Sequence, residues 1–134
     1  MKYIIMLLIV IGAALTDFAT GYIKAYSHDE VYSKKMRIGG LNKLCEIIVM
    51  SAAIGLTIGL EQLGRYYNSP QLTELAGAVT AISVFIYIVL MEIVSVLENL
   101  AAIFPDAAWI GRLIKRFRLM SSNIEKEEKD NDIR

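Results

Sequence analysis

Three long apolar stretches in a chain of 134 residues constrain this sequence more than any other feature. They occupy about residues 3–26, 41–60 and 71–102. A helix that crosses a bilayer needs about 20 mostly apolar residues, and the hydrocarbon offers the backbone no other hydrogen-bond partner. The sequence therefore predicts an all-α membrane protein with three transmembrane helices, which together form a transmembrane domain of residues 1–104.

The composition supports this interpretation, since 55% of the residues are hydrophobic and only 21% are charged. A water-soluble domain of this size needs more polar surface to cover its core. A cleavable signal peptide is the competing interpretation of the first stretch, because Lys2 precedes an apolar run. Apolar residues resume after Asp17, however, and Leu15-Thr16-Asp17 lacks a small-x-small cleavage pattern. We therefore expect the first stretch to remain as a membrane helix.

Lysine and arginine are unevenly distributed among the segments between the apolar stretches. The second connection, residues 61–74, holds Arg65 as its one basic residue. The first connection and the segment after the third stretch are basic, with Lys24, Lys34, Lys35, Arg37 and Lys43 in or beside the former and Arg112, Lys115, Arg116 and Arg118 in the latter. Because basic loops stay in the cytoplasm, we expect the N-terminus outside and the C-terminus inside.

Residues 105–120 have the pattern of an amphipathic helix. Its apolar side holds Ile110, Leu113, Ile114, Phe117 and Met120, with Trp109 at the edge, and its opposite side holds Arg112, Lys115, Arg116 and Arg118. Such a helix favours the inner membrane surface, where anionic lipids attract cations; packing against the rest of the chain is the alternative. Residues 121–134 are charged and aperiodic, which predicts a disordered tail.

Each apolar stretch also carries one stripe of polar residues. A charge at mid-bilayer costs about 2.5–3.5 kcal/mol on insertion scales, so such residues face a partner, the bundle interior or water. The candidates for pore lining or assembly are Asp17, Thr20, Gly21, Lys24, Lys43, Glu46, Glu92, Glu98 and Asn99. Pairing of the carboxylates with basic residues of neighbouring helices is the alternative. Lys43 and Glu46 are three residues apart and can pair within one helix.

Small residues provide a second signal for helix association. Ser51, Gly55 and Gly59 recur at intervals of four, a spacing that lets two membrane helices approach closely. Gly77 and Ala81 form a weaker version of this pattern. The face of Ser51, Gly55 and Gly59 is therefore a candidate helix-packing face between copies of the chain.

No motif for catalysis, cofactor binding or metal binding is present. The single histidine, His28, lies beside acidic residues in a polar segment, and the single cysteine, Cys45, excludes a disulfide within one chain. There is no phosphate-binding glycine loop, HExxH or CxxC. The basic cluster near Arg112 lacks the length and context expected for nucleic acid. We therefore expect no enzyme, no cofactor and no nucleic-acid partner.

Several short motifs follow one another in a fixed order between about residues 10 and 110. They are Asp17-Phe18-Ala19-Thr20-Gly21 with Lys24, Ser33-Lys34-Lys35, Gly40-Leu41-Asn42-Lys43, Glu98-Asn99 and Pro105. In this order they resemble the toxin-secretion and phage-lysis holin family of Gram-positive phages and clostridia. The order of the motifs along the chain, rather than any one of them, carries the resemblance.

The resemblance implies a homo-oligomer that accumulates in the bacterial cytoplasmic membrane. At a set time it would open lesions through which an endolysin, or a toxin without a signal peptide, crosses without stable binding, and the host cell lyses. The motif residues would then serve structure or assembly. A second start at Met6, which would remove Lys2, is a further hypothesis, since paired starts regulate some holins. A small ion or solute channel subunit and a non-conducting antiholin or membrane adaptor are the alternative functions.

Overall fold

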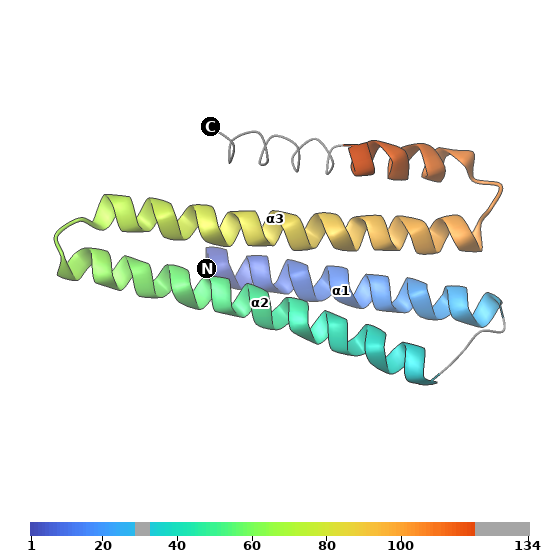
Figure 1. Cartoon of the computed structure of the whole chain (residues 1–134), viewed down its shortest axis with the longest axis horizontal. Coiled ribbons are helices and arrows are strands. Elements are labelled where there is room, and N and C mark those ends of the chain that lie inside the picture. Colours follow the sequence, from blue (N-terminus) through green and yellow to red (C-terminus); the bar gives the residue numbers. More distant parts are fainter. Residues whose placement is uncertain (29–32, 120–134) are drawn as a thin grey trace, which may run out of the picture.

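Three long α-helices lie side by side in the computed structural model, which describes residues 1–28 and 33–119 (Figure 1). They are α1 (Lys2–Ser27), α2 (Ser33–Tyr66) and α3 (Pro70–Ile103). In this view α1 and α3 run from left to right and α2 from right to left, so α2 is antiparallel to both of its neighbours. All three helices are long and apolar enough to cross a membrane. The predicted all-α architecture with three spans is confirmed.

The helix α2 extends well beyond the apolar stretch of residues 41–60 at both ends. Eight of the fourteen flanking residues, in 33–40 and 61–66, are lysine, arginine, methionine, glutamate, glutamine or leucine, which are good helix formers whether or not lipid surrounds them. Hydropathy therefore marks the part of a helix that suits lipid, and it does not mark where the helix ends. As a result Lys34, Arg37 and Arg65 lie in the end turns of α2.

A tight turn joins α2 to α3, and one glycine makes it possible. Ser69 N donates to the carbonyl oxygen of Gly64 at 3.0 Å, and Asn68 has a φ of 54°, in the left-handed region that asparagine tolerates. A Cβ on Gly64 would lie 3.1 Å from the Cα of Pro70. Pro70 occupies the first turn of α3, where its missing N–H has no partner to lose.

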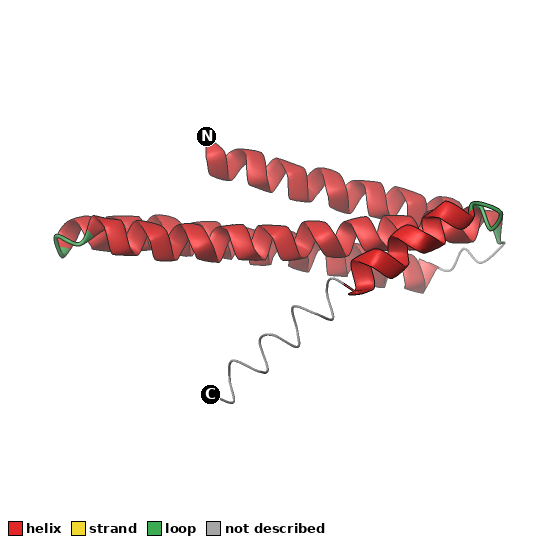
Figure 2. Cartoon of the chain, turned by 90° about the horizontal axis from the view of Figure 1, so that it is seen from above, coloured by secondary structure: helices red, strands yellow, loops and turns green. Residues whose placement is uncertain are grey.

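A shorter helix follows α3, as the sequence predicts. After a turn at residues 104–107, residues 108–119 are helical. In both views this helix runs back beside the end of α3 (Figures 1 and 2). Met120 and residues 121–134, predicted as the end of the amphipathic helix and as a disordered tail, lie outside the described residues.

The core of the bundle is narrow. Val10, Met50 and Ile88, one from each long helix, form its centre and are at most 5% exposed. Only 17% of the most apolar window in each spanning helix is buried inside the chain. Large apolar side chains such as Leu8 and Leu56 point outward instead. A surface of this kind is stable in water only when covered, and lipid or other copies of the chain provide that cover in a membrane.

Candidate functional site

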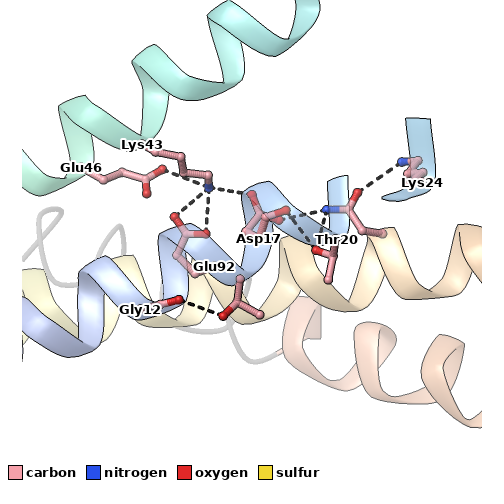
Figure 3. Close-up of polar contacts among 9 residues, drawn as sticks. Gly12, Asp17, Thr20, Lys24, Lys43, Glu46 and Glu92 are labelled. Carbon is pink, nitrogen blue, oxygen red and sulfur yellow. Dashed lines mark hydrogen bonds and ion pairs between the residues drawn. The ribbon is translucent and has the colours of Figure 1, made fainter. Parts of the chain in front are cut away.

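Lys43 of α2 lies at the centre of an ion-pair network that joins all three long helices (Figure 3). Its Nζ lies 2.8 Å from Oδ2 of Asp17 in α1. It also donates to both carboxylate oxygens of Glu92 in α3, at 2.7 and 2.8 Å. Glu46, one turn further along α2, lies 3.7 Å away, as its spacing predicted. The ammonium group of Lys43 therefore forms ion pairs with one carboxylate from each of the three long helices.

These charges are largely removed from the surface. Glu92 is 1% exposed and Asp17 is 7% exposed. A buried charge is tolerated when it is paired and hydrogen-bonded, and Lys43 supplies that pairing. Glu46 is less protected, with 29% of its side chain exposed, and its Oε2 is buried without a hydrogen-bond partner among the described residues. The group holds three carboxylates against one ammonium, an excess of negative charge.

Asn99 of α3 extends the same contact toward the end of α1. Its Nδ2 donates to Oδ1 of Asp17 at 3.0 Å and to Oγ1 of Thr20 at 3.3 Å. Its Oδ1 accepts a 3.5 Å hydrogen bond from Nζ of Lys24. A Cβ on Gly21 would lie 3.5 Å from Nδ2 of Asn99, an ordinary contact distance. Two motifs about 80 residues apart in the chain thus form one contact.

Seven of the nine polar candidates meet in this place, which we call the polar network: Asp17, Thr20, Lys24, Lys43, Glu46, Glu92 and Asn99. Gly21 packs beside it. Glu98 lies elsewhere and accepts a hydrogen bond from Nη2 of Arg118. In a single chain Asp17 and Glu92 therefore pair with a lysine of a neighbouring helix, which was the alternative interpretation of the stripes, while Glu46 pairs within its own helix.

The candidate packing face of α2 is turned away from the bundle, and Ser51 bonds only to the carbonyl oxygen of Ile47 in its own helix. Ser51, Gly55 and Gly59 are all exposed, and a Cβ on either glycine would meet nothing within 4 Å. The close approach of α2 to α3 occurs at Thr57 and Gly77 instead. Thr57 is fully buried, its Oγ1 lies 2.8 Å from the carbonyl oxygen of Gly77, and a Cβ on Gly77 would lie 2.9 Å from Cγ2 of Thr57.

A second polar contact, which the sequence did not indicate, lies at the opposite end of the bundle. Glu61 of α2 accepts a hydrogen bond from the hydroxyl of Tyr3, and its Oε1 lies 3.9 Å from Nζ of Lys2. Tyr3 and Glu61 are 58 positions apart, and neither of the two stands out in its own helix. Only the register between α1 and α2 brings them together.

The helix of residues 108–119 has its apolar side turned inward. Ile110 is 3% exposed, while Trp109 is 54% exposed. The hydrogen bond from Arg118 to Glu98 ties this helix to α3. The remaining basic candidates, Arg112, Lys115 and Arg116, are all exposed. The structure thus leaves a basic face available outside the bundle, and its contact with anionic lipid stays a prediction.

Within residues 1–28 and 33–119, no three histidine, cysteine, aspartate or glutamate side chains are arranged to hold a metal ion. At the polar network the space among the carboxylates is occupied by the ammonium group of Lys43. The arrangement favours electrostatic cross-linking of the three helices.

The comparisons with known proteins agree with the motifs. A sequence model of the bacteriophage holin family matches residues 1–118, which covers the three long helices and all but the last residue of the shorter one. No curated protein and no solved structure gives a significant match. The three apolar helices make the chain a multi-pass membrane protein. It belongs to the bacteriophage holin family.

Proposed function

We propose that this chain is a holin that acts by assembly rather than by catalysis. Copies associate in the bacterial cytoplasmic membrane and, at a timed point, open lesions that release an endolysin or a toxin without a signal peptide. The observation that carries this proposal is the polar network, because it places charged residues of three apolar helices on the inside of one chain. The family match over residues 1–118 supports it.

The polar network gives the chain a closed form that lipid tolerates. While Asp17, Lys43 and Glu92 remain in contact, the outer surface at mid-membrane is apolar. Separating the helices would turn each polar stripe outward, and each charge exposed to hydrocarbon costs about 2.5–3.5 kcal/mol. The cost disappears where the polar stripes of neighbouring copies line a common water-filled space, because the charges then face water and not hydrocarbon. Opening therefore depends on how many copies are close together, which links the surface density of the protein to the time of lysis.

The proposed orientation keeps the polar network near the cytoplasmic side of the membrane. The basic residues at the start of α2 and the exposed Arg112, Lys115 and Arg116 then lie in the cytoplasm. Each basic residue near an anionic surface contributes about 1 kcal/mol of attraction. The helix of residues 108–119 would therefore hold the cytoplasmic end of the bundle at the inner leaflet.

Inducible expression beside a cytoplasmic endolysin that lacks a signal sequence tests the proposed function. We expect abrupt lysis after a fixed delay, and only when both proteins are present. The optical density of the culture measures the lysis. Growth arrest without release of the endolysin would point instead to a narrow ion or solute channel. No effect on viability or membrane potential would point to an antiholin or a membrane adaptor.

Two substitutions in the polar network are expected to move the time of lysis in opposite directions. Asp17→Asn removes a 2.8 Å ion pair of Lys43 and weakens the closed form, so lysis should come earlier. Glu46→Gln removes the carboxylate that Lys43 compensates least and lowers the negative charge beside Glu92, so lysis should come later. The delay is measured at matched protein levels. Unchanged delays in both variants would contradict a gating role of the network.

A further inference from the structure

One face of α3 changes from exposed to covered along the length of the helix. Val79 is 55% exposed, and Ser83, one turn further, is exposed as well. Eighteen residues make five complete helical turns, so Leu97 and Ala101 lie in line with these two residues on the same face. Leu97 and Ala101 are nevertheless half-buried. The helix of residues 108–119 runs back beside this part of α3, on the side away from α1 and α2, and covers it (Figure 1).

The covering helix uses its apolar side for this contact. Its covered residues recur every three or four positions and therefore share one side of the helix; they are Ile110, Leu113, Ile114 and Phe117. The chain can fold back because Pro105 does not continue α3, and the N–H of Ala107 donates to the carbonyl oxygen of Phe104 in the turn that follows. This helix and the last turns of α3 thus form a closed helical hairpin.

The polar tie that closes the hairpin is weak. Nη2 of Arg118 lies 2.5 Å from Oε1 of Glu98, but the two side chains are 69% and 42% exposed. An ion pair at such an exposed position contributes little, because water and salt screen it. The hairpin is therefore held closed chiefly by the apolar side of the shorter helix.

That apolar side has a second possible partner. A basic amphipathic helix lies on a membrane surface with its apolar side among the acyl chains, and the same side cannot contact α3 at the same time. Both positions remove it from water, so the difference between them is set by charge. The closed hairpin offers one exposed ion pair, whereas an anionic leaflet attracts every basic residue that reaches its headgroups. The exposed residues on the basic side are Arg112, Lys115 and Arg116.

We propose that the helix of residues 108–119 is a switch that leaves α3 for the anionic phospholipid headgroups of the inner leaflet. The proposal rests on the inner-leaflet placement given above and not on the release of an endolysin. In neutral lipid the hairpin stays closed, and in anionic lipid it opens. Opening uncovers Leu97 and Ala101, so the apolar outer face of α3, which begins near the exposed Leu75, extends to the cytoplasmic end of the helix.

A cross-link between Glu98→Cys and Arg118→Cys, in a chain that also carries Cys45→Ala, reports the closed hairpin. The full chain is reconstituted at high lipid-to-protein ratio in vesicles of phosphatidylcholine, alone or with phosphatidylglycerol. A bis-maleimide that spans the roughly 8–10 Å between packed helices joins the thiols efficiently only in the closed form. We expect cross-linking to be about tenfold slower in the anionic vesicles and to recover in high salt. The pair Tyr3→Cys and Glu61→Cys, at the other end of the bundle, should cross-link equally fast in both lipids.

Trp109 reports the arrival of the helix at the lipid in the unmodified chain, because it is the single tryptophan and is 54% exposed. Quenching of its fluorescence by lipids with brominated acyl chains should rise about twofold when phosphatidylglycerol is added. Arg112→Gln with Arg116→Gln should abolish the rise. Lys34→Gln with Arg37→Gln removes two exposed basic residues of α2 at the same end of the bundle and should leave the rise intact.

Equal cross-linking of the Glu98 and Arg118 positions in the two lipids would overturn the switch. If both rates are fast, the helix stays on α3, and if both are slow, it is not docked in either bilayer. A rise in quenching that persists without Arg112 and Arg116 would overturn it as well. The lysis assay is independent of these results. A chain that shows the lipid dependence and releases no endolysin would contradict the proposed function and leave the switch standing.

Discussion

Lys43→Met is expected to cause the largest loss of stability of any single substitution in the bundle. The ammonium group contacts Asp17 and both oxygens of Glu92, and Glu92 is 1% exposed. Removing one partner of a buried ion pair costs about 3–5 kcal/mol, because the remaining charge has no compensation. The full stability of a protein is typically about 5–15 kcal/mol. Titration of the purified chain in mild detergent with dodecyl sulfate, followed by circular dichroism, measures the free energy of unfolding.

Two further variants separate charge from packing. Lys34→Met removes an exposed lysine at the start of α2 and should leave the free energy of unfolding within experimental error. A triple variant with Lys43→Met, Asp17→Asn and Glu92→Gln removes the whole set of charges, and it should recover most of the loss, because a neutral replacement leaves no charge unpaired. If the triple variant is as unstable as Lys43→Met alone, the packing of the lysine stem and not its charge holds the helices.

The three membrane-spanning helices were predictable because a segment that crosses the hydrocarbon must be long and apolar. Each stretch that must face hydrocarbon is long and apolar, and no packing detail is needed to recognise it. The ends of α2 were not predictable in the same way. They are set by helix propensity in segments of mixed polarity, so the helix begins at Ser33 and ends at Tyr66 although the apolar stretch covers only residues 41–60.

The members of the polar network were predictable, and most of their partners were not. Charged residues are conspicuous in an apolar helix, so the sequence alone indicated these candidates. The spacing of Lys43 and Glu46, three residues apart in one helix, predicted their contact directly. The pair of Lys43 and Glu92 is 49 positions apart, and Asn99 is 82 positions from Asp17. These pairs depend on the register between helices. The close contact of Thr57 with Gly77 belongs to the register of α2 against α3, and the sequence marks it only weakly.

The polar stripe of α2 also explains why the more regular pattern of small residues is not used inside the chain. Lys43, Met50 and Thr57 are seven residues apart and lie on one face of the helix, and Met50 and Thr57 are fully buried. Ser51, Gly55 and Gly59 lie on another face, which is exposed. Only one face of α2 can meet the bundle, and the charged residues decide which one. The small face remains available to another copy.

Gly77→Leu and Gly55→Leu therefore form a matched pair with different expected outcomes. A Cβ on Gly77 would already lie 2.9 Å from Cγ2 and 3.2 Å from Cα of Thr57, and the backbone cannot move aside as a side chain can. Overpacking typically costs about 1–3 kcal/mol, and loss of the Thr57 hydrogen bond adds to it. The free energy of unfolding should fall clearly in Gly77→Leu and stay unchanged in Gly55→Leu, whose Cβ meets nothing within 4 Å.

Cross-linking between copies in vesicles should show the reverse order of effects for a folded chain. Gly55→Leu places a large side chain on the small face of α2 and should reduce the cross-linked fraction while the fold persists. If cross-linking is unaltered, the copies do not meet at Ser51, Gly55 and Gly59. Association would then use another exposed face, and α1 offers one around Gly12, where a Cβ also meets nothing within 4 Å. The same substitution made there, Gly12→Leu, tests that contact, and it should reduce the cross-linked fraction only if copies meet through α1.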